Sequence, residues 1–137
     1  MINALLPWPP SVNRYWRQVR VDRHGRPSSV FVRVSKEGKA YRDVVAKEML
    51  RYADAKQYRG CKVWVEIIAT RNDRRKYDLD NILKALLDAL VHAGVLVDDF
   101  DVDQLTVERR QVALAEKSRV NVRIGAMGYG EVSFKEW

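Results

Sequence analysis

The sequence predicts a small α/β domain of the α+β type, in which a mixed β-sheet packs against two main helices. Predicted strands and helices interleave along the chain, and this order is typical of layered α/β arrangements. The chain has 137 residues, of which 47% are hydrophobic, and both values are ordinary for one globular domain. We expect residues 1–125 to form that domain and residues 126–137 to form a C-terminal tail.

The N-terminal quarter is predicted to contain an extended segment followed by a basic loop. Residues 1–10 end in Pro7-Trp8-Pro9-Pro10, and proline confines such a stretch to an edge strand or a rigid loop. Residues 11–34 show no clean period, so we expect a long basic loop that could contain a ragged β-hairpin.

Two helices have the clearest periodic patterns. The first is predicted over residues 36–55 and follows Ser35, whose hydroxyl can cap it. The second begins near residue 79 and ends at Gly94, since glycine often follows the end of a helix. Its apolar side chains recur at positions i, i+3, i+4, i+7 and i+8: Leu79, Ile82, Leu83, Leu86, Leu87 and Leu90.

Three further strands complete the predicted sheet. Residues 61–70 are rich in Val, Ile and Trp, so we expect a mostly buried strand there. Residues 71–77 predict a basic loop between this strand and the second helix. Residues 104–114 and 119–124 predict two strands joined by a turn at residues 115–118.

Composition restricts the class of protein. The single cysteine, Cys61, excludes a disulfide framework and a zinc site made of several thiolates, and we expect it to be a core thiol. No apolar run approaches the ~20 residues of a membrane-spanning helix. The N-terminus also lacks the basic start of a signal peptide, so we expect a cytoplasmic location. The net charge of +7 predicts an anionic partner.

The net charge is the sum of sharply separated regions. Residues 11–36 contain seven basic residues and one acidic residue, and residues 71–76 contain four basic residues and one acidic residue. Residues 78–103 instead contain seven aspartates and one basic residue, Lys84. Because like charges repel, this acidic island destabilises the fold unless a divalent cation or the neighbouring arginines neutralise it.

The first acidic constellation, Asp78-Leu79-Asp80-Asn81, lies at the predicted start of the second helix. Carboxylates at a helix N-terminus are stabilised by the helix dipole, so a capping role explains one aspartate well and two less well. On the same helix, Asp80, Lys84 and Asp88 are spaced by four residues. This spacing favours an exposed ladder of ion pairs, and the alternative is the wall of a site where Lys84 contacts phosphate.

The second constellation is residues 98–103, which contain four aspartates and the D-x-D-x-D beginning of an EF-hand loop. The match fails at the sixth and twelfth loop positions, so we exclude that calcium motif. Asp98 and Asp99 directly follow the apolar residues 95–97. We expect them at the end of a short buried strand, which suits metal ligands, while a solvated acidic loop is the alternative for the other two aspartates.

The available side chains favour chemistry at phosphorus with a hard cation. The sequence has no G-x-S-x-G elbow, no phosphate-cradling glycine loop and no dinucleotide fingerprint. Carboxylates, lysine and arginine remain, and this set suits Mg²⁺, which takes oxygen ligands. Mg²⁺ held by two or three aspartates can activate water and stabilise an in-line displacement at phosphorus.

The basic segments are suited to binding a nucleic-acid backbone. Arginine and lysine contact phosphates without regard to base sequence, and the affinity that results falls with salt. Tyr15, Trp16 and Phe31 alternate with the arginines and could stack on exposed bases. A merely solvated basic loop is the alternative, but the regular spacing of its arginines favours nucleic-acid binding.

Three stretches taken together resemble the RusA family of Holliday junction resolvases. Residues 6–15 are similar to the opening motif of the family, and Tyr41-Arg42-Asp43 is similar to its first-helix signature. The resemblance covers about residues 4–112. The most specific stretch is residues 73–84, followed in order by Leu87-Asp88-Ala89-Leu90, Gly94 and Asp98-Asp99.

The resemblance implies a homodimeric, Mg²⁺-dependent endonuclease that acts in DNA recombination and repair. Such enzymes nick two opposed strands of a four-way DNA junction symmetrically and leave ligatable 5′-phosphate ends. Asp78, Asp80 and Asp99 fall on the metal-binding catalytic aspartates of the family, and Asp98 is a further metal ligand. Lys84 falls on its catalytic lysine, which orients the attacking water or stabilises the phosphate.

The resemblance also implies where DNA is contacted. Tyr77 departs from the family pattern, which has a basic residue there, and the loop of residues 15–34 is longer than expected. A DNA-binding protein without catalysis, which uses only the basic loop, is the alternative function. The residues expected to contact DNA are Asn13, Arg14, Arg17, Arg20, Arg23, Arg26, Arg74, Arg75 and Lys76.

Overall fold

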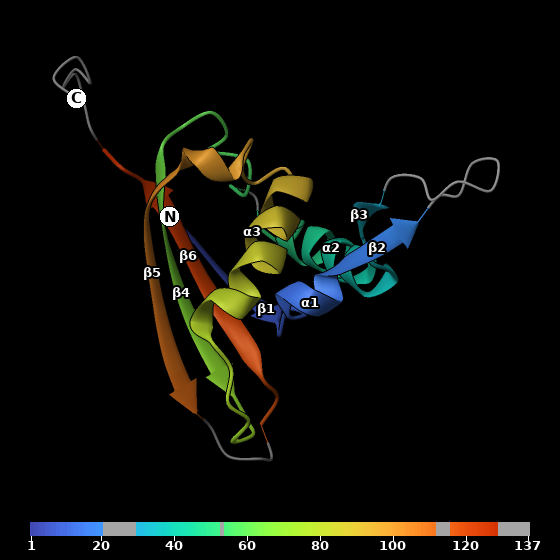
Figure 1. The fold of residues 1–137 in the computed structure, drawn as a ribbon. Coiled ribbons are helices and arrows are strands. Elements are labelled where there is room, and N and C mark those ends of the chain that lie inside the picture. The colour runs from blue at the N-terminus through green and yellow to red at the C-terminus, as the bar shows by residue number, and fades with distance from the viewer. Residues whose placement is uncertain (21–29, 53, 112–115, 129–137) are drawn as a thin grey trace, which may run out of the picture.

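The computed structural model describes residues 1–20, 30–52, 54–111 and 116–128 (Figure 1). Helices and strands interleave as predicted, so the α+β class is confirmed. In chain order the elements are β1 (Ile2–Pro7), α1 (Val12–Tyr15), β2 (Trp16–Arg20), β3 (Val30–Val34), α2 (Lys36–Met49), β4 (Val63–Arg71), the 3₁₀ helix η1 (Leu79–Ile82), α3 (Leu83–His92), the 3₁₀ helix η2 (Asp99–Asp101), β5 (Val102–Gln111) and β6 (Arg119–Ala126).

The main sheet has four strands in the order β1-β6-β4-β5. β6 pairs antiparallel with both β1 and β4, whereas β5 pairs parallel with β4, so the sheet is mixed as predicted. β1 is an edge strand, which agrees with the prolines that follow it. The two C-terminal strands, β5 and β6, are consecutive in the chain but do not pair with each other, because β4 lies between them.

The helices cover one face of this sheet, and the core lies between the two layers (Figure 1). Alternate residues of β4 are buried, as a strand with one covered face requires. α2 contributes Tyr41, Val45 and Met49 to this core. α3 contributes Leu86 and Leu90 from the predicted apolar stripe. No helix in the described residues is long and apolar enough to cross a membrane.

The second predicted helix is confirmed with one difference at its start. Its first turn, η1, is a 3₁₀ helix, and α3 continues it from Leu83. Gly94 follows the end of α3 with a φ of 79°, a conformation that glycine adopts without strain. The sequence therefore predicted the position of this helix and its stop signal.

The first predicted helix is confirmed at its start and wrong at its end. The Ser35 hydroxyl accepts a hydrogen bond from Gly38 N at 3.0 Å, which is the expected N-cap. α2 ends at Met49, six residues before the predicted end. Leu50 is 83% exposed, whereas Ala55 and Tyr58 are buried. The chain must leave the helix for these two later side chains to reach the core.

The basic N-terminal segment contains more structure than a loop. The short helix α1 is missing from the predicted elements. β2 and β3 form the antiparallel hairpin that the sequence allows, with Trp16 opposite Val34. This hairpin projects away from the main sheet beyond α1 and α2 (Figure 1). Residues 21–29, including Arg23 and Arg26, lie outside the described residues.

Three smaller predictions have different outcomes. Cys61 is exposed and precedes β4, so the prediction of a core thiol is wrong. Val95 and Leu96 are buried but adopt no strand, because they pack in the turn after α3. β6 extends to Ala126, and residues 129–137 of the predicted tail lie outside the described residues.

Gly38 provides a test of the contact between α2, α1 and β3. A Cβ atom at this position would lie 2.8 Å from Val34 Cγ1 and 2.9 Å from the carbonyl oxygen of Tyr15. We expect Gly38→Ala to lower the free energy of unfolding by about 1–2 kcal/mol, because backbone must move to admit the methyl group. Chemical denaturation measures this, with Lys39→Ala, at an exposed position of the same helix, as the control. Equal free energies of unfolding for the two variants would contradict the prediction, because α1 would then move to admit the methyl group at no cost in stability.

Candidate active site

Two side chains of α3 and two aspartates of the second acidic constellation meet in one cavity. The cavity has a volume of about 210 Å³. It is lined by Lys84 and Asp88 of α3, by Asp98, which precedes η2, and by Asp99, the first residue of η2. Residues 95–97 connect the two elements, and the burial of Val95 and Leu96 fixes the turn that brings Asp98 and Asp99 back toward α3. The cavity therefore combines three carboxylates and one ammonium group.

Asp88 is held on one side by two residues from distant parts of the chain. Its Oδ2 accepts hydrogen bonds from the Tyr15 hydroxyl and from Nε and Nη2 of Arg42, at 2.9 Å and 2.6 Å for the two Arg42 nitrogens. Arg42 Nε also donates to the Tyr15 hydroxyl oxygen at 2.9 Å. Tyr15 is fully buried, and the side chains of Arg42 and Asp88 are about a quarter exposed. This cluster joins α1, α2 and α3 at the edge of the cavity.

Two carboxyl groups of the cavity, those of Asp88 and Asp98, have different electrostatic environments. Burial raises the pKa of Asp88, the charge of His92 opposes this, and the charge of Asp99 adds to it. The guanidinium of Arg42 favours the charged form of Asp88. Asp98 is a surface carboxyl whose pKa is lowered, chiefly by the hydrogen bond that its Oδ1 accepts from Phe100 N at 2.9 Å. Asp98 is therefore ionised at neutral pH.

The first acidic constellation lies at the start of η1. Asp78 occupies the N-cap position, but its side chain makes no capping hydrogen bond, so the capping interpretation is not supported. Asp78 and Asn81 line a groove with the basic loop, while Asp80 is exposed on η1. Among the described residues, Asp88 pairs with Arg42 and no ion pair joins Lys84 to Asp80, so the predicted ladder is wrong.

The structure places the predicted metal ligands along two different hollows of the surface. Asp78 lines the basic groove, and Asp98 and Asp99 line the cavity beside Lys84. Within the part of the chain that the structure describes, no three His, Cys, Asp or Glu side chains form a group that could hold a metal ion. A site made of Asp78, Asp80 and Asp99 together stays a prediction.

The basic groove beside Asp78 has a volume of about 800 Å³ and is lined by both the 71–77 loop and β5. Arg74, Arg75 and Lys76 are exposed along it, as a DNA contact requires. Asp73 orders the loop, because it accepts a hydrogen bond from Arg71 Nε at 2.8 Å and one from Arg75 N at 3.0 Å.

The N-terminal residues predicted to contact DNA are exposed where they are described. Asn13 and Arg14 lie on α1, and Arg17 and Arg20 lie on β2. Tyr15 is buried against α3, so the prediction that it stacks on bases is wrong. Two other aromatic residues were predicted to stack on bases. The ring centroid of Trp16 lies 5.8 Å from Lys84 Nζ. Phe31 is 38% exposed, and the guanidinium of Arg33 lies over its ring.

Sequence reasoning missed four residues of these sites. Tyr15 and Arg42 hold Asp88, and both stand in motifs that the sequence singled out for other reasons. Arg109 of β5 covers the Tyr77 ring at 4.8 Å and donates a hydrogen bond from Nη2 to the Tyr77 carbonyl oxygen at 2.8 Å. Arg71 stacks on Trp8 at 4.8 Å. No local pattern marks these pairs, because each joins residues that are distant in sequence.

Comparison with known proteins gives one consistent family. The family model described as endodeoxyribonuclease RusA matches residues 7–125. A crossover junction endodeoxyribonuclease RusA of Escherichia coli K12 is 39% identical over 123 residues, which are 90% of this chain and 92% of the relative. The corresponding protein of Enterobacteria phage HK97 is 38% identical over 105 residues, which are 77% of this chain and 79% of the relative. These matches cover most of both sequences, and the chain belongs to the RusA family of endodeoxyribonucleases.

Proposed function

We propose that this protein is an endodeoxyribonuclease that resolves four-way DNA junctions. The observation that carries the proposal is the similarity, over 90% of the chain, to enzymes named crossover junction endodeoxyribonucleases. The structure supports it with an acidic cavity and a basic groove on neighbouring parts of η1 and α3. DNA bound along the groove would be close to the carboxylates.

We infer that a divalent cation, Mg²⁺, is the cofactor. The donors at hand are carboxylate oxygens, which suit a hard cation, and the lowered pKa of Asp98 keeps one of them charged. Asp78, Asp80 and Asp99 would hold the cation, with Asp98 supporting them. When bound, the cation polarises the scissile phosphate and favours deprotonation of the attacking water.

The other residues of the site bind and orient the DNA. The Lys84 ammonium group, on the cavity wall, would contact a non-bridging phosphate oxygen and stabilise the charge that develops there. Arg74, Arg75 and Lys76 would neutralise neighbouring backbone phosphates along the groove. Binding therefore brings a phosphate toward aspartates that would repel it without the cation.

A homodimer is part of the proposal. A four-way junction has approximate two-fold symmetry, so a closed dimer would place two identical sites on opposed strands. The edge strand β5 is mostly exposed along its ten residues, and an exposed edge is a surface on which a second subunit can pair. Sedimentation equilibrium of the full chain should give twice the mass of 15.9 kDa, and a monomer at all micromolar concentrations would contradict this part.

Removal of the cation tests the catalytic role of the acidic residues. We expect the protein to bind a synthetic four-way junction in EDTA without cutting it, and to cut it when Mg²⁺ is added. A linear duplex with the same sequences should remain uncut in both conditions. Cutting that persists in EDTA would contradict the cation role, and junction binding without cutting in either Mg²⁺ or Mn²⁺ would indicate a DNA-binding protein without catalysis.

A further inference from the structure

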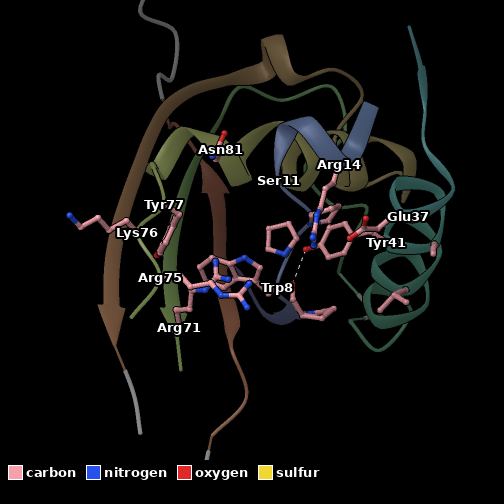
Figure 2. A pocket seen from close by; sticks show the side chains of 15 residues that line it. Trp8, Ser11, Arg14, Glu37, Tyr41, Arg71, Arg75, Lys76, Tyr77 and Asn81 are labelled. Carbon is pink, nitrogen blue, oxygen red and sulfur yellow. Dashed lines mark hydrogen bonds between the residues drawn. The ribbon is translucent and has the colours of Figure 1, made fainter. Parts of the chain in front are cut away.

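A pocket of about 560 Å³ lies between the proline-rich segment at residues 7–11 and the basic loop at residues 71–77 (Figure 2). Its volume is within the range of small-molecule sites. The predicted catalytic aspartates do not line it. Its lining combines the aromatic rings of Trp8, Tyr41 and Tyr77 with the cations of Arg14, Arg71 and Arg75.

The aromatic walls of the pocket are held in place by their neighbours. Trp8 and Tyr77 meet edge to face, with ring centroids 5.1 Å apart and planes at 89°. The guanidinium of Arg71 lies 4.8 Å from the Trp8 ring and 5.4 Å from the Tyr77 ring. On the opposite wall, the Tyr41 hydroxyl donates to the carbonyl oxygen of Pro7 at 3.0 Å. A pocket with fixed walls loses little conformational entropy when it binds a ligand.

The charge of the pocket favours an anion. Four basic side chains line it against one acidic residue, Glu37. Arg71 is paired with Asp73 at 2.8 Å, so its guanidinium serves mainly as a wall. Arg75 lies farther from Asp73, at 3.8 Å, and its side chain is 77% exposed, so its guanidinium can turn to a ligand. Figure 2 shows the side chain of Lys76 extending away from the other labelled residues. An anionic ligand would therefore find its charge partners in Arg14 and Arg75.

The pocket is continuous with the basic groove. Five residues line both: Arg71, Arg75, Lys76, Tyr77 and Asn81. The groove reaches Asp78, so a strand that enters the pocket can continue toward the acidic residues. Aromatic rings beside a positively charged track are the usual means of binding nucleotides that have left a duplex.

We propose that this pocket binds one unpaired nucleotide of the DNA substrate, with its base against Trp8 and Tyr77 and its phosphate near Arg14 and Arg75. The inference rests on the proposed function, because it takes the junction as the DNA. In an open junction, the base pair at the exchange point of each arm has a stacking neighbour on one side only, so its bases leave the stack at a lower free-energy cost than bases inside a helix. Such a pocket would favour junctions over linear duplexes.

An abasic substitution in the DNA, combined with a substitution in the pocket, tests this inference. Affinity for a synthetic junction is measured in EDTA, so cutting is not required. Each nucleotide next to the exchange point is replaced in turn by an abasic site. In the wild type we expect one such position to weaken binding roughly 5- to 30-fold. In Trp8→Leu the same abasic site should change affinity less than about twofold, because the ring that contacts the base is gone.

Two controls and one competition complete the experiment. Trp64→Leu removes an indole that does not line the pocket, so this variant should keep the wild-type abasic effect. Arg14→Gln, a substitution on the surface, should weaken junction binding severalfold even if Trp8→Leu does not fold. Micromolar deoxynucleoside monophosphate should not displace the junction.

The results distinguish failure of the nucleotide-pocket inference from failure of the proposed junction-cutting function. The inference would be overturned if no abasic site weakened binding of the wild type. It would also be overturned if the abasic site weakened binding of the wild type and of Trp8→Leu equally. Both results would count even if the protein cuts junctions. Displacement by micromolar mononucleotide would also overturn it, because the site would then take free nucleotides. A protein that cuts no junction but shows the Trp8-dependent abasic effect would refute the proposed function and support the pocket.

Discussion

Asp80→Asn is expected to lower the rate of junction cleavage by about a hundredfold to a thousandfold while junction binding is retained. The amide has nearly the shape of the carboxylate but lacks the negative charge that holds a divalent cation. Asp80 is exposed on η1 and makes no ion pair among the described residues, so the substitution should not destabilise the fold. Single-turnover cleavage and gel-shift affinity of the same preparation measure the two effects.

The matched control for this variant is Asp54→Asn, in the turn that follows α2. It makes the same chemical change away from both the cavity and the groove. We expect wild-type cleavage from it. If Asp80→Asn cut as fast as Asp54→Asn, the first acidic constellation would not belong to the active site.

Arg42→Ala is expected to lower the free energy of unfolding by about 2–3 kcal/mol and to slow cleavage. The substitution leaves the partly buried Asp88 with the Tyr15 hydroxyl as its remaining hydrogen-bond donor in the cluster. It also removes the polar contact between α2 and α3 at the edge of the cavity that Lys84 lines. Urea denaturation measures the stability, and cleavage is compared well below the melting temperature, where the variant is folded.

A double-mutant cycle separates this ion pair from a general loss of packing. Arg42→Ala and Asp88→Asn should be strongly non-additive, because each removes the same contact. Arg51→Ala is the control, because it removes an exposed arginine that lies 3.7 Å from Glu48. We expect it to change the free energy of unfolding by no more than about 0.5 kcal/mol. Additive effects of Arg42→Ala and Asp88→Asn would contradict a specific role for the pair.

Elements with strong local signals were predicted well from the sequence. The leucine stripe of α3, Ser35 at the start of α2 and Gly94 after α3 each depend on residues within a few positions of one another. The end of α2 was wrong because it is decided by the burial of Ala55 and Tyr58, which is a tertiary effect. The position of β4 between β5 and β6 pairs strands that are far apart in the chain, so no local pattern marks it.

The sequence predicted which residues belong to the candidate site better than it predicted which side chains contact one another there. The resemblance to the RusA family implied that Lys84 and Asp99 belong to one site, and the structure places both on one cavity. The partners of Asp88 were not predictable, because Tyr15 and Arg42 precede it by 73 and 46 residues. The alternation of aromatic residues with arginines indicated base stacking for Tyr15, and only the fold shows that its hydroxyl is used inside the protein.

We expect the acidic cavity and the basic groove together to bind a four-way junction and cut it. The most direct test is a synthetic junction in which each of the four strands is labelled separately and the products are mapped after incubation with Mg²⁺. We predict nicks at symmetric positions in two opposed strands, with 5′-phosphate ends that ligase can seal. Four intact strands after long incubation with Mg²⁺ and Mn²⁺, under conditions in which the junction is bound, would contradict the account.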